Sequence, residues 1–136
     1  MTYVKILSLL PVCALLLMSA DSTLIEPPGL VARLSSKPAI FHVGPNVLYR
    51  SKHIPGAIYA GPGSKSEGLA LLKESVSGLP RDREIVIYCG CCPWDRCPNV
   101  QPAMALLNEM GFKRVKALHL AQNFKTDWID HNYPIE

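Results

Sequence analysis

The sequence predicts an α/β fold of three layers, in which helices flank a small, mostly parallel β-sheet. Short apolar runs alternate along the chain with apolar residues at helical spacing. The run at residues 84–88 has no polar alternation, which is typical of a central strand buried on both faces of a parallel sheet. The length of 136 residues allows one domain at most.

The first half of the domain is predicted to contain three strands and two helices. Pro27 and Pro28 open the first helix, because proline is tolerated in the first helical turn. Residues 44–46 are a turn signal after the second strand, and Ser64 or Ser66 caps the second helix. The elements are a strand at 24–25, a helix at 27–34, strands at 39–43 and 57–60, and a helix ending before Pro80.

The second half is predicted to continue this alternation with two strands and two helices. Asn99 is the predicted N-cap of the first of these helices, and Gly111 is its predicted C-cap. Trp128 is expected to pack inward from the last helix. The elements are a strand at 84–88, a helix ending at Met110, a strand at 115–118 and a helix at 123–132.

Residues 1–22 have the order of features that is typical of a secretory signal peptide. Lys5 gives a positive start, residues 6–18 are almost wholly apolar, and small or polar residues follow. The apolar run is shorter than the ~20 residues of a membrane span. We therefore expect cleavage to leave residues 23–136 as a secreted or periplasmic domain with no membrane attachment. The alternative is an uncleaved N-terminal membrane anchor.

The charge distribution argues against a nucleic-acid partner. The formal net charge is +3, and the basic residues are scattered along the chain. They do not form the stripe of basic and aromatic residues that is typical of nucleic-acid binding. A weakly basic surface instead suits small anions.

Four cysteines, Cys89, Cys91, Cys92 and Cys97, lie within nine residues that directly follow the predicted central strand. The fifth, Cys13, belongs to the predicted signal peptide. Because all four lie in one loop, disulfides among them would close only short loops and stabilise the fold little. A thiol between a strand end and a helix N-terminus is well placed for thiolate chemistry. The cluster therefore indicates chemistry rather than structural cross-linking.

Four segments between residues 49 and 134 carry motifs that are specific in their order and spacing. Tyr49 precedes the sequence H-I-P-G-A-I at 53–58, and V-I-Y-C at 86–89 leads into the cysteine cluster. Trp128 begins a closing W-x4-Y-P pattern. Together these segments resemble the rhodanese family of sulfurtransferases, in which such a strand delivers the active-site cysteine.

The chain departs from the family pattern in two places. Residues 42–44 read H-V-G where the family often has D-V-R, so the usual ion pair is not expected there. The loop from Cys89 to Asn99 is also about five residues longer than family loops. Alignment from the strand makes Cys89 the nucleophile, whereas alignment backwards from the following helix places it near Trp94. We favour the strand, because insertions fall in loops.

The resemblance implies a rhodanese-like fold and a sulfurtransferase with no cofactor and no resident metal. Cys89 would attack the outer sulfur of a donor such as thiosulfate and hold it as a persulfide. A thiophilic acceptor would then take the sulfur: cyanide, a small thiol or a protein thiol. An ordinary thiol is mostly protonated at neutral pH, so backbone N–H groups and the following helix N-terminus must stabilise the thiolate.

Other loop residues are expected to form the substrate site. Gly90 lets the backbone approach closely, Trp94 would wall the pocket, and Arg96 suits the sulfonate end of a donor. Cys92 and Cys97 are candidates for a redox or sulfur-relay role, the alternative being that they only line the loop. The expected substrate-binding residues are Gly90, Cys91, Cys92, Trp94 and Arg96.

Three other functions compete with this one. Four thiolates could hold a soft ion such as Cu(I) or Zn(II), although C-x-C-C-x4-C is not a familiar zinc pattern. A related phosphatase or arsenate reductase would need C-x5-R, which neither Cys89 nor Cys91 forms with Arg96. The third is a non-catalytic sulfur carrier that relies on a partner enzyme.

Overall fold

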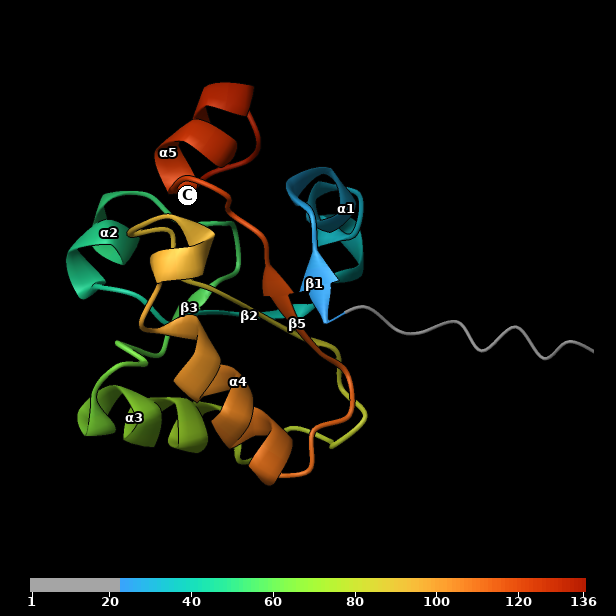
Figure 1. Cartoon of the computed structure of the whole chain (residues 1–136). Helices are drawn as coiled ribbons and strands as arrows, with labels where there is room; N and C mark the ends of the chain where they lie inside the picture. Colours follow the sequence, from blue (N-terminus) through green and yellow to red (C-terminus); the bar gives the residue numbers. More distant parts are fainter. Residues whose placement is uncertain (1–22) are drawn as a thin grey trace, which may run out of the picture.

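A computed structural model describes residues 23–136, which form a five-stranded parallel sheet covered by helices on both faces (Figure 1). The strand order is β1-β5-β4-β2-β3, so β4 is central, as its apolar run predicts. The α/β prediction is therefore confirmed. The strands are β1 (Leu24–Ile25), β2 (Ala39–His42), β3 (Ile58–Tyr59), β4 (Ile85–Tyr88) and β5 (Val115–Leu118).

Helices α3 (Ser66–Val76) and α4 (Val100–Glu109) cover one face of the sheet, and α1 (Pro27–Val31), α2 (Asn46–Ser51) and α5 (Phe124–Asp127) lie on the other (Figure 1). Alternate residues of β4 divide between two cores. Ile85 and Ile87 pack with α3 and α4, whereas Val86 and Tyr88 pack with α1 and α5. This alternation follows from the two-residue period of a strand.

Several predicted helix boundaries are wrong. The helix expected at 27–34 is α1 followed by a separate 3-10 turn, Leu34–Ser36, and the helix expected at 123–132 is α5 followed by the 3-10 turn Ile129–His131. α2 was not predicted, because six residues after a Gly-Pro turn signal carry too short a helical pattern. Trp128 is fully buried, as expected.

Of the predicted helix caps, the one before α3 is wrong, whereas Gly111 ends α4 with a φ of +87° directly after the C-cap Met110. The N-cap position of α3 is Lys65, and neither Ser64 nor Ser66 caps it. Asn99 does occupy the N-cap position of α4, but its side chain makes no capping hydrogen bond. The Asn99 side chain donates to the Cys89 thiol instead.

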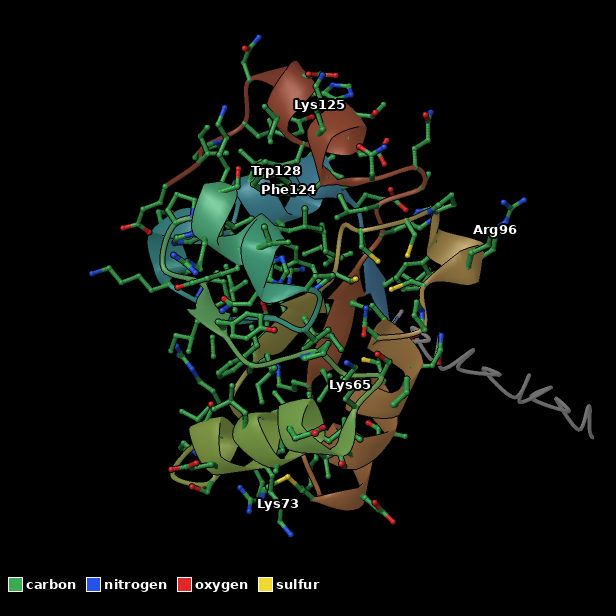
Figure 2. The ribbon with its side chains drawn as sticks, turned by 90° about the vertical axis from the view of Figure 1, so that its left-hand side faces the viewer. Lys65, Lys73, Arg96, Phe124, Lys125 and Trp128 are labelled. Atoms are coloured by element: carbon green, nitrogen blue, oxygen red, sulfur yellow. The ribbon has the colours of Figure 1, made fainter. Side chains whose placement is uncertain are left out.

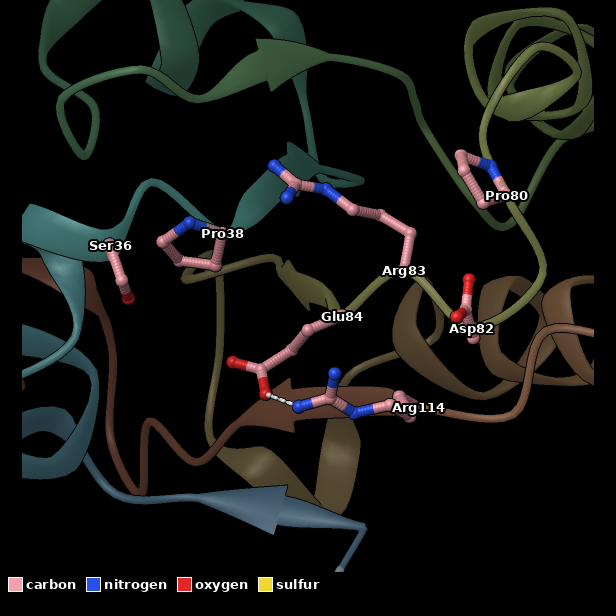
Figure 3. Close-up of a pocket in the computed structure, with 7 residues that line it drawn as sticks. All are labelled: Ser36, Pro38, Pro80, Asp82, Arg83, Glu84 and Arg114. Carbon is pink, nitrogen blue, oxygen red and sulfur yellow. Dashed lines mark hydrogen bonds and ion pairs between the residues drawn. The ribbon is translucent and has the colours of Figure 1, made fainter.

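The amino ends of β2, β4 and β5 border an ion-pair network next to a pocket of about 370 Å³ (Figure 3). The Glu84 carboxylate accepts hydrogen bonds from Arg33 at 3.1 Å and from Arg114 at 3.0 Å. Both arginines are about half exposed, which is typical of a stabilising surface cluster.

The predicted signal peptide, residues 1–22, lies outside the described residues. Among residues 23–136 the helices are too short to cross a bilayer.

Candidate functional site

Cys89 directly follows β4 at the carboxyl end of the sheet. It continues the row of Ile85 and Ile87, so its side chain points toward the face that α4 covers. Only 3% of Cys89 is exposed. The central strand therefore fixes the position of this sulfur, which the longer loop leaves unchanged.

The four loop cysteines converge on one point. Their Sγ atoms all lie within 4.8 Å of one another. The Sγ atoms of Cys89 and Cys91 are 3.2 Å apart, and those of Cys91 and Cys92 are 2.6 Å apart. All four are free cysteines, and Cys91, Cys92 and Cys97 are partly exposed. The structure thus brings together every cysteine of the predicted site.

Asn99 is a site residue that the sequence interpretation missed. Its Nδ2 donates to Cys89 Sγ at 3.3 Å and lies 3.9 Å from Cys91 Sγ, while its Oδ1 accepts the Ser64 N–H at 3.0 Å. The side chain is 3% exposed. Its amide is therefore committed to the cluster rather than to the helix cap, and an N–H donor at this distance stabilises negative charge on sulfur.

Within the cluster, the surroundings of Cys97 favour the thiolate most strongly. Interaction with the Cys89 thiol and the backbone N–H groups of Asn99 and Val100 lower the pKa of Cys97 to about 5, although burial opposes this. The interaction with Cys97 and burial raise the pKa of Cys89, and burial raises the pKa of Cys92 to about 12. The helix N-terminus thus stabilises the anion on Cys97 at rest, with Cys89 protonated beside it.

Two cavities border the cluster. A small one of about 10 Å³, room for a single atom, is lined by three of the cysteines and by apolar side chains; its lining residues are Cys89, Gly90, Cys92, Trp94, Cys97, Val100, Leu118 and Leu120. The outer one, about 480 Å³, is bordered by Gly90, Cys91, Lys52 and Lys125. Figure 2 shows Lys125 at one end of the molecule, on α5. The ammonium of Lys125 is paired with the Asp130 carboxylate at 2.9 Å, so Lys52 is the cation that this pocket offers to an anion.

The remaining predicted residues divide between the site and the surface. Gly90 adopts a φ of +75°, and an added Cβ would meet Phe124 at 2.6 Å, so this position requires glycine. Trp94 lines the small cavity. Arg96 is exposed, and its side chain points away from the body of the protein (Figure 2). It does not line either cavity beside the cysteines.

The sequence H-V-G at residues 42–44, where the family often has D-V-R, leaves space for the Cys89 sulfur. A Cβ on Gly44 would lie 2.8 Å from Cys89 Sγ and 2.9 Å from its carbonyl oxygen. The Gly44 N–H donates to His42 Nδ1 at 3.2 Å. Burial lowers the pKa of His42 to about 4, so the ring is neutral and its nitrogen can accept this bond. A neutral histidine and a glycine therefore replace the charged residues that the family often has here.

Residues 27–120, most of the described fold, match the rhodanese-like domain family. The chain belongs to this family. No functionally curated protein matches its sequence significantly. The predicted resemblance is thus confirmed at the level of the family.

Solved structures agree on the fold. A crystal structure of the Alr3790 protein from Anabaena sp. is 24% identical, with a TM-score of 0.62 over 82% of this chain and 81% of that one. Thiosulfate sulfurtransferase from Pseudomonas aeruginosa is 20% identical, with a TM-score of 0.60 over 82% of this chain and 19% of that one. A persulfide form of EanB with ergothioneine is 24% identical, with a TM-score of 0.63 over 84% of this chain and 28% of that one.

Proposed function

We propose that this rhodanese-like domain is a sulfurtransferase that carries sulfane sulfur as a persulfide on Cys89. The observation that carries the proposal is the position of Cys89 Sγ, fixed by the central strand and facing both the Asn99 amide and the anionic Cys97. Sulfurtransferase activity is common in this family. The structures of a thiosulfate sulfurtransferase and of persulfidated EanB, which share the fold, support the same chemistry.

The proposed first step is attack on the outer sulfur of a donor such as thiosulfate. Cys89 passes its proton to the Cys97 thiolate as its sulfur bonds to the sulfane sulfur, so that bond formation drives the proton transfer. The S–S bond of the donor breaks, and its electron pair leaves with sulfite. The negative charge now lies on the outer sulfur of the Cys89 persulfide, which the single-atom cavity beside Cys89 can shelter from water.

In the second step an acceptor removes this sulfur. A thiolate or cyanide attacks the outer sulfur, the persulfide S–S bond breaks, and its electron pair returns to Cys89, which recovers its proton from Cys97. Lys52 and Lys125 border the outer pocket beside Cys91. We assign to this pocket the anionic group of the donor or acceptor, because cations concentrate small anions. This role replaces the one expected for Arg96.

We further propose that the domain works outside the cytoplasm, since residues 1–22 have signal-peptide features. Expression of the full chain with a C-terminal tag in a bacterium tests this. The mature N-terminus, read by intact mass and cell fractionation, is expected near residue 23 in the periplasmic fraction. An intact N-terminus in the membrane fraction would show that the segment is an anchor.

The decisive experiment is intact mass spectrometry of the reduced protein after exposure to thiosulfate. Wild type is expected to gain one sulfur atom and to lose it to cyanide. Cys89→Ser should abolish the gain, and Cys91→Ser should keep it. If Cys92→Ser or Cys97→Ser abolishes sulfur uptake while Cys89→Ser retains it, the persulfide forms on the helix side of the loop and the assignment to Cys89 is wrong.

Turnover separates an enzyme from a passive carrier. Steady production of thiocyanate from thiosulfate and cyanide, many times per protein molecule, is expected of the enzyme. A single sulfur that is released only by a partner protein would identify a non-catalytic carrier instead.

A further inference from the structure

The cysteine cluster contains more sulfur than persulfide chemistry requires. One thiol suffices to hold a persulfide, yet four Sγ atoms lie within 4.8 Å of one another. Within residues 23–136 this is the one group of histidine, cysteine or acidic side chains spaced closely enough to share a metal ion. Its donors are all sulfur, which favours soft ions over magnesium or calcium.

Three of the four cysteines line one small cavity. Cys89, Cys92 and Cys97 line the cavity of about 10 Å³, whose other walls include Trp94 and Leu118. A cavity of this size holds one atom. Cys91 instead borders the outer pocket of about 480 Å³. The donors around the cavity are therefore three thiols, and its walls provide a dry apolar shell.

We propose that Cys89, Cys92 and Cys97 bind one Cu(I) ion in this cavity as a three-coordinate thiolate site. Cu(I) is a closed-shell soft ion that forms stable complexes with three thiolates. Each ligating thiol loses its proton to solvent, and no electron is transferred. Apolar side chains around the three sulfurs limit the access of water and larger ligands, as suits a soft-metal site.

Zinc fits this arrangement less well. A tetrahedral zinc site with Zn–S bonds of about 2.3 Å separates its sulfurs by about 3.8 Å, and structural zinc requires four ligands. The fourth sulfur would be Cys91, whose Sγ lies 2.6 Å from that of Cys92. Adjacent residues would have to separate by more than an ångström to ligate zinc together, whereas three-coordinate copper leaves Cys91 outside.

Copper and sulfur would then compete for one cavity. The bound ion occupies the space beside Cys89 that we assign to the outer persulfide sulfur, so Cu(I) should block sulfur uptake. This competition rests on the proposed function, whereas copper binding itself does not.

The test is an anaerobic titration of the full chain carrying Cys13→Ser, so that the four loop cysteines are the remaining thiols. The reduced protein receives Cu(I) against a colorimetric Cu(I) chelator, and native mass spectrometry counts bound ions. We expect one copper per chain and a thiolate-to-copper absorption band. Cys92→Ser and Cys97→Ser should weaken binding by more than about 100-fold, while Cys91→Ser, the matched control, should change it less than about threefold.

The possible results distinguish failure of the copper site from failure of the sulfurtransferase proposal. If Cys91→Ser and Cys92→Ser lose Cu(I) affinity equally, the three-coordinate copper site is wrong. Preferential retention of Zn(II) by the wild type would also overturn it. Absence of bound copper in a folded wild type, judged by circular dichroism, would do the same. If copper binds as expected but thiosulfate never adds sulfur to metal-free protein, the copper site stands and the sulfurtransferase proposal fails.

Discussion

The two ends of the parallel sheet differ in how they handle charge. At the amino end, Glu84 is paired with Arg33 at 3.1 Å and with Arg114 at 3.0 Å, and both arginines are about half exposed. Figure 3 shows the pair with Arg114. At the carboxyl end, a thiol and backbone N–H groups lower the pKa of Cys97 to about 5. One end uses full opposite charges, and the other uses a thiol and backbone dipoles.

This difference explains why one end is suited to chemistry. A carboxylate held by two guanidinium groups is a poor nucleophile, because its lone pairs are engaged. A thiolate held by N–H groups keeps its lone pairs available, because hydrogen bonds lower its pKa without neutralising it. The comparison predicts that changes at the carboxyl end affect reactivity strongly and that changes at the amino end affect stability weakly.

The largest effect is expected from Gly44→Ala. The new Cβ would lie 2.8 Å from Cys89 Sγ, so the sulfur or its loop must move, and misplacement by about 1 Å can reduce a rate about 100-fold. Sulfur transfer from thiosulfate to cyanide measures the effect. Gly78→Ala is the matched control, because its Cβ would meet nothing within 4 Å. Equal activity of the two variants would show that sulfur transfer does not need the space between Gly44 and Cys89 Sγ.

Cys97→Ala tests where the negative charge lies. The pKa of Cys97 is lowered to about 5, so the metal-free wild type should react with iodoacetamide above about pH 5 and lose this reactivity as the pH falls through that value. The variant lacks the thiol whose pKa is lowered, and a free thiol is only about 3% ionised at pH 7, so its reactivity should fall about 30-fold. An unchanged pH profile would place the anion on another sulfur.

Asn99→Ala removes the one side-chain amide that donates to Cys89 Sγ within the described site. Losing a hydrogen bond of this kind should slow sulfur uptake by Cys89 about tenfold. Asn108→Ala, at an exposed position of the same helix, is the control. A variant that is less stable but takes up sulfur at the wild-type rate would show that Asn99 only supports the fold.

Most of the fold could be predicted from the sequence because its strands are marked by local pattern. The buried run of β4 and the glycine after α4 are signals that neighbouring residues alone create. The errors concern short helices. α2 and α5 have six and four residues, and such helices are stabilised by tertiary contacts rather than by periodicity.

The candidate site was predictable only where its residues are adjacent in sequence. The cysteine cluster is visible directly, whereas the amide of Asn99 and the lysines of the outer pocket reach the site through the folded chain. Asn99 shows the limit best: its position before a helix favours capping, yet burial against Cys89 gives its side chain a different partner. Likewise, the neighbouring thiols and the helix N-terminus, rather than the strand, determine which cysteine is anionic.

The smallest effect is expected at the amino end of the sheet. Glu84→Gln removes the charge shared by Arg33 and Arg114 but keeps the shape of the side chain. Because both arginines are exposed and their charges are screened by salt, the free energy of unfolding should fall by about 1 kcal/mol or less. Urea denaturation at low and high salt measures this, with Glu74→Gln, at an exposed position of α3, as the control. Sulfur transfer by folded Glu84→Gln should equal that of wild type. A clear loss of transfer without loss of stability would mean that the two ends are coupled through β4, and the division between a stabilising end and a reactive end would not hold.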